Sequence, residues 1–248
     1  MNKFIPTIVS RPQSSNLMNV LVPVIAVILT LLTGSIIFSI MGFNPFFALH
    51  TFFISPISTS YGISELLVKA TPLALIAIGL AFCFKNNIYN IGAEGQLTMG
   101  AIFGGGIGIY FYDTNTFWLL PLMVLGGAIG GALWAMIPAL LKTKFNTNEI
   151  LTSLMLVYVA LLILDYLVVG PWKDPLGYSF PKTRQFSESG RMPLLFSGLR
   201  VHFGLIITLV LIFFSWFIFS KTIFGFQLKV SGFSPTAARY AGFNQNIL

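Results

Sequence analysis

Amide and carboxylate side chains cluster with glycines in one short stretch, Asn86-Asn87-Ile88-Tyr89-Asn90-Ile91-Gly92-Ala93-Glu94-Gly95-Gln96. The stretch separates two apolar segments and has more hydrogen-bonding groups than a short solvated turn needs. Near a membrane, non-helical backbone is tolerated only where protein or a water-filled cavity satisfies its polar groups. The stretch is therefore interpreted either as a turn that lines or gates a pathway, or as an ordinary cytoplasmic loop between two helices.

A second patterned stretch extends from Gly225 to Gly242. Ser234 is a good N-cap, Pro235 suits the first helical position, and Gly242 is placed to end a helix with a positive φ. One to two helical turns are predicted between them, over Ala237, Ala238, Arg239 and Tyr240. A helix this short is not stable alone. It is interpreted either as a handle that a partner protein clamps or as a packed juxtamembrane turn.

Residues that could carry out catalysis are few. The sequence has no G-x-x-x-x-G-K-[ST] phosphate loop, since Ser220 precedes Lys221-Thr222 where a glycine is needed, and it has no H-E-x-x-H or G-x-S-x-G motif. Asp165 is the clearest acid within an apolar segment, which makes it a functional candidate. Its place near the end of that segment also fits a side chain that snorkels to the interface. The chain is predicted not to be an enzyme.

The composition predicts a polytopic membrane protein. Of the 248 residues, 56% are hydrophobic and only 8% are charged, whereas soluble domains carry roughly 25% charged residues. The same values exclude a disordered chain, and a single cysteine, Cys83, excludes a disulfide scaffold. The net charge of +7 includes no basic run of five or more residues, which argues against a nucleic-acid partner.

Six stretches are apolar enough to cross the bilayer core, which takes about 20 residues. The predicted fold is an all-α, polytopic membrane helix bundle with spans over 17–41, 66–84, 97–112, 117–141, 150–169 and 201–220. The segment 42–63 is apolar but interrupted by Pro45 and Pro56, and is interpreted as an external loop in the interface, with a re-entrant piece as the alternative. Small residues four apart predict close helix packing, at Gly100, Gly104, Gly108, Gly126, Gly127, Gly130 and Gly131.

The distribution of Lys and Arg among the short loops predicts a cytoplasmic N-terminus. With Lys3 and Arg11 inside, the turns that hold Lys85, Lys142 and Lys221 are also inside. The long segment 170–200 is then external, although its own basic residues weaken the rule.

Five runs together resemble one family: NIGAEGQ at 90–96, NEILTSLMLVY at 148–158, GPWKDP at 170–175, FPKT at 180–183 and SPTAARYAG at 234–242. They look like the permease subunits of bacterial ABC importers for nucleosides and simple sugars, in the group that includes ribose and branched-chain amino acid permeases. The resemblance covers nearly the whole chain. GPWKDP and FPKT look most like the nucleoside branch.

The resemblance implies one transmembrane permease domain over 1–248, multi-pass in the bacterial cytoplasmic membrane. Its expected partners are a second permease subunit of the same or a related chain, ABC ATPase subunits that bind ATP and Mg, and a substrate-binding lipoprotein or periplasmic protein. The chain itself is expected to bind no cofactor, metal or nucleic acid. Family members typically continue through further spans, so the chain is predicted to be truncated before them.

The resemblance also implies functional residues. A cytoplasmic coupling segment, 225–242, would engage the ATPase, with Tyr240 and Ala238 in the docking contact and Arg239 donating a charged hydrogen bond. The coupling residues are Ser234, Pro235, Ala237, Ala238, Arg239, Tyr240 and Gly242. The pathway or gate residues are Asn90, Gly92, Glu94, Gly95, Gln96, Asn148 and Glu149.

The expected function is ATP-driven import of a nucleoside or simple-sugar-like solute by alternating access. Two alternatives stay open. One is a secondary transporter driven by an ion gradient, with Asp165 or Glu94 as the proton or sodium site. The other is a membrane-embedded assembly protein without a pathway, in which the polar turns are only loops.

Overall fold

The computed structural model describes residues 15–178 and 180–243, and its regular structure is helical. Within these residues, β structure is limited to two isolated bridges, Lys173 with Thr183 and Leu194 with His202. The predicted all-α membrane fold is confirmed. Lys3 and Arg11, on which the predicted orientation partly depends, lie outside the described residues, as does the end of the chain.

The chain divides into two compact units, one ending at Ile63 and the other beginning at Ser64. The first unit contains α1 (Asn16–Ile40), α2 (Pro45–Leu49), a π-helical turn (His50–Ile54) and a 3-10 turn (Ser55–Ile57). The prediction of a loop over 42–63 was therefore wrong, because most of this segment is helical. Asn44 and Pro45 explain the helix start: the Asn44 side chain accepts hydrogen bonds from the N–H groups of Phe46 and Phe47, and proline suits the first helical position.

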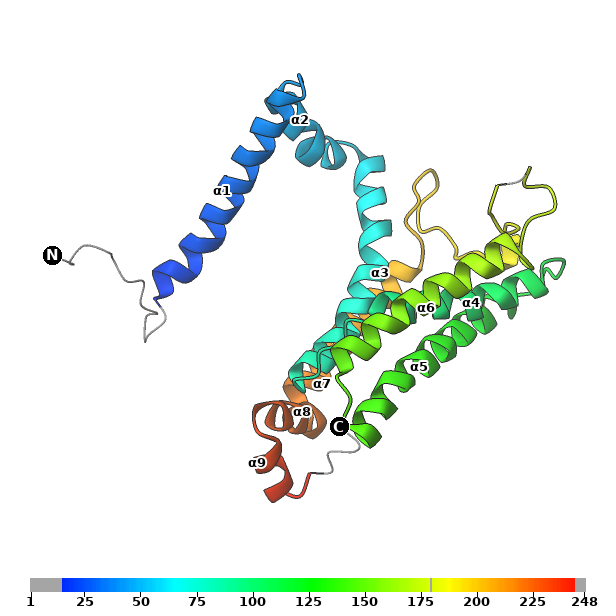
Figure 1. Cartoon of the computed structure of the whole chain (residues 1–248). Coiled ribbons are helices and arrows are strands. Elements are labelled where there is room, and N and C mark those ends of the chain that lie inside the picture. The colour runs from blue at the N-terminus through cyan, green and yellow to red at the C-terminus, as the bar shows by residue number, and fades with distance from the viewer. Residues whose placement is uncertain (1–14, 179, 244–248) are drawn as a thin grey trace. The chain divides into compact units, whose positions relative to one another are not determined.

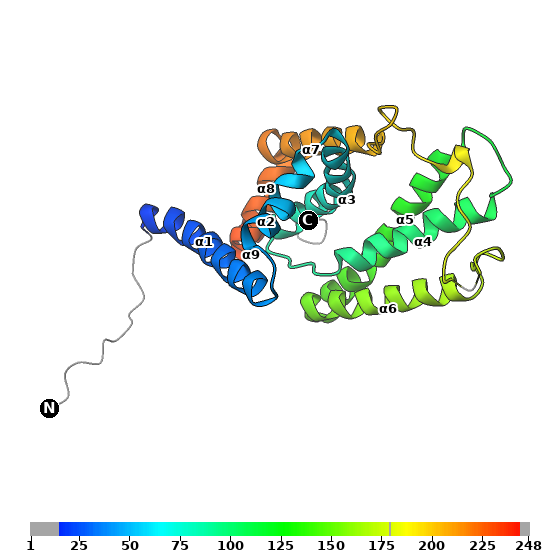
Figure 2. The ribbon, with the colours of Figure 1, turned by 90° about the horizontal axis from the view of Figure 1, so that it is seen from above.

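The second unit holds the remaining helices, joined by short turns and one long irregular segment (Figure 1). They are α3 (Ser60–Lys85), which begins just before the boundary, α4 (Ala93–Tyr110), α5 (Leu119–Phe145), α6 (Glu149–Val169), α7 (Gly204–Lys221), α8 (Ile223–Phe233) and α9 (Pro235–Tyr240). The segment between α6 and α7 contains a single 3-10 turn, Glu188–Gly190. The two views of the ribbon agree that α4, α5 and α6 lie side by side (Figure 2).

Five of the described helices are long and apolar enough to span a membrane: α1 from Leu17, α3, α5, α6 and α7. The predicted third span is a helix too, α4, but it is not among these five. Its 18 residues include Glu94, Gln96 and several glycines, which lower its hydropathy. The glycines among these residues allow close packing against neighbouring helices.

Glycines bring α4 and α5 together, as the four-residue spacing predicted. A Cβ at Gly100 would lie 3.0 Å from the carbonyl oxygen of Gly127, and one at Gly127 would lie 3.1 Å from that of Gly100. A Cβ at Gly104 would lie 2.7 Å from the carbonyl oxygen of Met123. Small residues permit this approach of two backbones in a membrane, where no hydrophobic force draws helices together.

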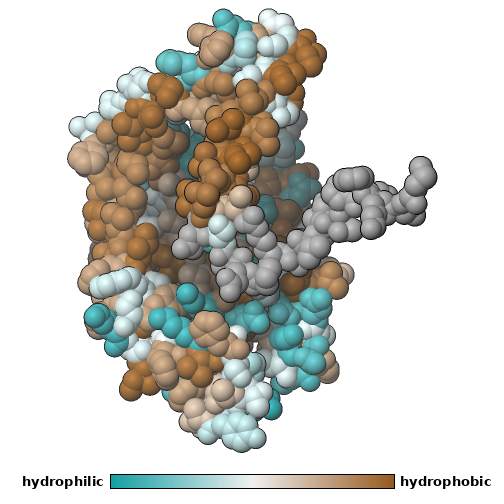
Figure 3. Space-filling model, turned by 90° about the vertical axis from the view of Figure 1, so that its left-hand side faces the viewer, coloured by the Kyte–Doolittle hydropathy of each residue, from teal (hydrophilic) through white to brown (hydrophobic). Residues whose placement is uncertain are grey.

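Helices α3 and α7 form the other part of the second unit. The rings of Phe82 and Phe219 are 4.3 Å apart, and Arg200, before α7, forms an ion pair of 3.1 Å with Glu65 near the start of α3. In the space-filling view, hydrophobic side chains cover much of the visible face, and hydrophilic ones gather toward the lower end, where α8 and α9 lie (Figure 3). This distribution suits a protein that is exposed to lipid along its helices and to water at their ends.

Candidate functional site

The polar turn reverses the chain between α3 and α4. Asn87 has φ +58°, a left-handed conformation that asparagine adopts more readily than most residues. Asn90 and Gln96 then pair through their side-chain amides: each amide nitrogen donates to the oxygen of the other, with both distances 3.3 Å. The Asn90 oxygen also accepts a hydrogen bond of 2.9 Å from the Gly92 N–H. These bonds fix the backbone where α4 begins.

The glycines of this turn lie against α6. A Cβ at Gly92 would be 2.9 Å from the Cβ of Ser153, and one at Gly95 would be 2.9 Å from the Cα of Val157. The N–H of Ile91 donates to the Ser153 hydroxyl at 3.2 Å, and Ser153 is buried. Gly92 and Gly95 therefore allow the turn to approach α6 more closely than any residue with a side chain could.

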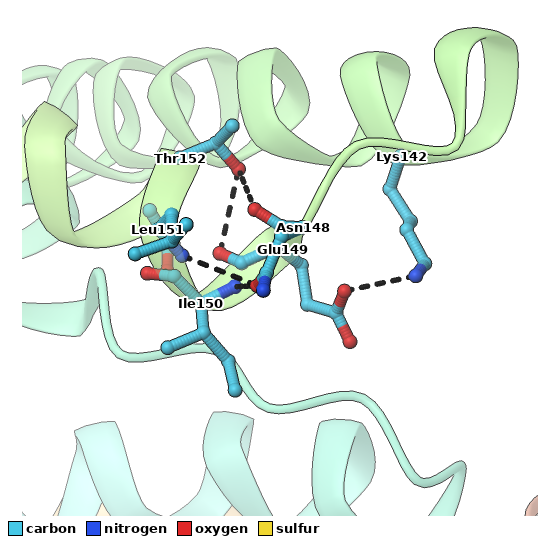
Figure 4. A network of polar contacts seen from close by, with 7 residues as sticks. Lys142, Asn148, Glu149, Ile150, Leu151 and Thr152 are labelled. Atoms are coloured by element: carbon cyan, nitrogen blue, oxygen red, sulfur yellow. Dashed lines mark hydrogen bonds and ion pairs between the residues drawn. The ribbon is translucent and has the colours of Figure 1, made fainter.

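The α5–α6 connection lies beside this turn (Figure 4). Asn146, with φ +50°, ends α5, and Asn148 caps α6 by accepting from the N–H groups of Ile150 and Leu151. Lys142 of α5 and Glu149 of α6 form an ion pair with 2.9 Å between Nζ and Oε2. The Glu149 carboxylate also interacts with the backbone amide of Tyr89 in the turn. Glu149 thus links α5, α6 and the turn.

A cavity of about 280 Å³ lies where these elements meet, at the end of the α4–α6 group that we call the turn end. It brings together three of the predicted pathway residues, Asn90, Gln96 and Glu149. Its other lining residues are Cys83, Ile88, Ala135, Pro138, Ala139, Lys142, Thr143 and Ser153. Sequence reasoning missed Cys83, Lys142 and Ser153 as site residues. For Lys142, the opposite charge of Glu149 across a short connection was a usable signal.

Four predicted pathway residues lie outside the lining of this cavity: Gly92 and Gly95, which pack against α6, and Glu94 and Asn148. Glu94 is exposed in the first turn of α4, where a carboxylate interacts favourably with the helix dipole. Asn148 acts as the α6 cap. Asp165, the acid of the ion-gradient alternative, is exposed on α6.

Residues 234–242 of the coupling segment have the local structure that the sequence predicted. The Ser234 hydroxyl accepts a hydrogen bond of 3.2 Å from the Ala237 N–H, Pro235 occupies the first turn of α9, and Gly242 has φ +77°. Tyr240 is 90% exposed. Ala238 is fully buried, so its expected place in a docking contact was wrong: its side chain faces its own chain, and its role is to pack α9.

Helix α8, which forms the first part of the coupling segment, was not predicted, and it lies against the turn end. Thr222 caps α8 by accepting from the Gly225 N–H. At the other end of α8, Gly232 lies against the backbone carbonyl of Lys85, the last residue of α3. The polar turn and the coupling segment, far apart in sequence, therefore meet.

The chain belongs to the family described as the permease component of the branched-chain amino acid transport system, which matches residues 62–248. The resemblance inferred from the sequence motifs is confirmed.

Individual relatives are similar over about nine-tenths of the chain. The chain is 34% identical, over 90% of its own length, to the glucose ABC transporter permease protein TsgB13 of Haloferax volcanii. It is 32% identical, over 92% of its length, to the guanosine ABC transporter permease protein NupP of Bacillus subtilis. It is 31% identical, over 91% of its length, to the nucleoside ABC transporter permease protein NupB of Lactococcus lactis. The chain spans 61%, 66% and 64% of these three relatives, respectively. No solved structure matches it.

Proposed function

We propose that this chain is the transmembrane permease subunit of an ATP-driven ABC importer that carries a nucleoside or a simple sugar into the cell by alternating access. The observation that carries the proposal is the similarity, over about nine-tenths of the chain, to permeases named for guanosine, nucleosides and glucose. The proposed location is the cytoplasmic membrane, with the N-terminus and the turn end facing the cytosol.

The proposed partners are those that the family's activity requires. The sequence contains no phosphate-binding loop, so an ABC ATPase subunit would supply ATP binding and hydrolysis, with Mg. A second permease subunit, the same or a related chain, would complete the pathway, and a binding protein would deliver the solute. In this arrangement, the chain itself carries out no chemical step.

The coupling segment is proposed as the contact with the ATPase. Tyr240 and Arg239 lie exposed on α9 and offer an aromatic ring and a guanidinium group, which are typical anchors of protein interfaces. Since Gly232 of α8 lies against the end of α3, a pull on α9 would reach the polar turn. ATP can drive transport only if it binds the two conformations with different affinity.

The test is solute uptake by the complete transporter in proteoliposomes. With its ATPase subunits and binding protein present, we expect ATP-dependent uptake of radiolabelled guanosine or glucose, and loss of uptake when the ATPase carries an inactive phosphate loop. Uptake that persists without ATP and follows an imposed proton or sodium gradient would overturn the proposal in favour of a secondary transporter. Failure of the chain to co-purify with any ATPase would also count against it.

A further inference from the structure

The cavity at the turn end has walls that are mainly apolar, with a few polar groups and no net charge. Ile88, Ala135 and Pro138 provide apolar surface, and the lining charges, on Lys142 and Glu149, neutralise each other in the ion pair. We propose that this cavity holds the transported solute as an uncharged ring compound, and that the Lys142–Glu149 pair closes it toward the cytosol. This inference rests on the proposed function.

The volume sets the size of the occupant. Ligand pockets for drug-sized molecules measure about 300–1,000 Å³, so a cavity of about 280 Å³ suits a smaller group. A nucleobase or a monosaccharide has this character: a flat or compact ring with apolar faces and hydrogen-bonding edges. Small apolar walls with a few directed polar groups are the usual composition of such sites.

The Asn90–Gln96 pair provides hydrogen-bonding capacity at the cavity wall. A side-chain amide has two N–H donors and an oxygen with two lone pairs. Among the described hydrogen bonds, the pair uses one N–H of each amide, and the Gln96 oxygen accepts only from Asn90. Each amide thus has an N–H to offer to a ring nitrogen, carbonyl or hydroxyl oxygen, and its orientation is already fixed by the other amide.

The absence of net charge in this lining excludes phosphorylated compounds. A phosphate that enters a largely apolar cavity loses its hydration, and only a matching positive charge could compensate. Lys142 cannot compensate while it is paired with Glu149 at 2.9 Å. The site therefore distinguishes a nucleoside from its nucleotide, and a sugar from its phosphate ester.

The position of the Lys142–Glu149 ion pair suits it to close the cavity toward the cytosol. Lys142 lies near the end of α5 and Glu149 at the start of α6, and their side chains are 38% and 18% exposed, so that the pair borders both the cavity and the solvent. Glu149 also interacts with the backbone amide of Tyr89, which connects the same carboxylate to the turn. Separation of this one pair would open the cavity without unfolding a helix.

Cys83, the single cysteine of the sequence, lines the cavity and reports on it directly. In the complete transporter, the rate at which N-ethylmaleimide alkylates Cys83 is followed by mass spectrometry of the peptide that contains it. We expect saturating guanosine or glucose, whichever is transported, to slow alkylation several-fold, and GMP or glucose 6-phosphate to leave it unchanged. Gln96→Ala should abolish the protection. Its matched control, Gln185→Ala in the segment 170–200, should retain it.

Three outcomes would overturn the inference. The first is ATP-dependent uptake of a solute that does not protect Cys83 from alkylation. The second is equal protection of Cys83 by a solute and by its phosphate ester. The third is an unchanged basal rate of Cys83 alkylation in Glu149→Gln, in which the ion pair is broken. Uptake is measured in the same vesicles. Protection of Cys83 without ATP-dependent uptake would support the cavity while contradicting the proposed function, so that the two failures are distinguishable.

Discussion

Gly232 of α8 lies against the backbone carbonyl of Lys85, and a Cβ at Gly232 would also lie 3.2 Å from the Cα of Asn86. This contact joins α8, the first helix of the coupling segment, to the first residues of the polar turn. Because backbone touches backbone there, neither side can yield by changing a rotamer. We therefore expect a displacement of α8 to be transmitted to the end of α3.

Gly232→Ala should disrupt this contact. The new methyl group would overlap the Lys85 carbonyl, and overpacking of this kind costs about 1–3 kcal/mol. We expect a lower thermal unfolding temperature in detergent and weaker stimulation of ATP hydrolysis by the solute. Gly79→Ala is the control, because Gly79 lies in α3 with nothing within 4 Å of the added Cβ. Equal effects of the two substitutions would show that the α8–α3 contact is unimportant.

Gly104→Ala should separate α4 from α5. Its Cβ would lie 2.7 Å from the Met123 carbonyl oxygen, whereas a Cβ at the adjacent Gly105 would be 3.5 Å from the Phe186 ring, an ordinary contact. We expect Gly104→Ala to lose about 1–3 kcal/mol of stability. Gly105→Ala should be neutral or slightly stabilising, since alanine favours the helix. Thermal unfolding of both variants in the same detergent measures the difference, and the reverse order would contradict the observed packing.

Arg239→Glu combined with Tyr240→Ala should uncouple ATP hydrolysis from transport. Both residues are exposed on α9, so the double substitution leaves the interior of the chain unchanged. We expect normal membrane insertion, with loss of solute-stimulated ATPase activity. Tyr178→Ala is the control, because Tyr178 is 94% exposed in the segment 170–200, away from the coupling segment. Unchanged coupling in the double variant would remove the support for a docking contact on α9.

Exchange of the charges at 142 and 149 should separate the ion pair's role from that of either residue alone. Lys142→Glu places two carboxylates together, and we expect uptake to fall several-fold, with a stability change of only about 0–1 kcal/mol because the pair is partly exposed. Adding Glu149→Lys restores opposite charges and should recover much of the uptake. Lys144→Glu, an exposed neighbour on the same helix, is the control. A double variant no better than Lys142→Glu would show that the pair does not act as a unit.

Local chemistry allowed residues 234–242 of the coupling segment to be predicted in detail. An N-cap, a first-turn proline and a left-handed terminator are each determined by the residue itself and its near neighbours. Ser234, Pro235 and Gly242 therefore have the conformations that the sequence indicated. The four-residue glycine spacing was informative for the same reason, since it places small residues on one face of a helix before any partner is known.

Long-range pairing could not be predicted in this way. Arg200 pairs with Glu65 across 135 positions, and Ser153 bonds to Ile91 across 62. No local rule specifies which residues so far apart in sequence will pair, because the pairing depends on how whole helices pack. The helix over residues 45–57 was missed for another reason: its prolines were read as breaks, although Pro45 follows an asparagine cap and begins a helix.

At the end of the α4–α6 group opposite the cavity, Trp172 packs at Gly106, Phe186 packs at Gly108, and Ser189 donates a hydrogen bond to the Thr114 carbonyl. Aromatic rings lie directly on glycines at this end, whereas the α5–α6 connection at the cavity end is bridged by a partly exposed ion pair. We therefore expect the helices of this group to stay packed beside Trp172 and any separation between them to begin at the ends near Glu149.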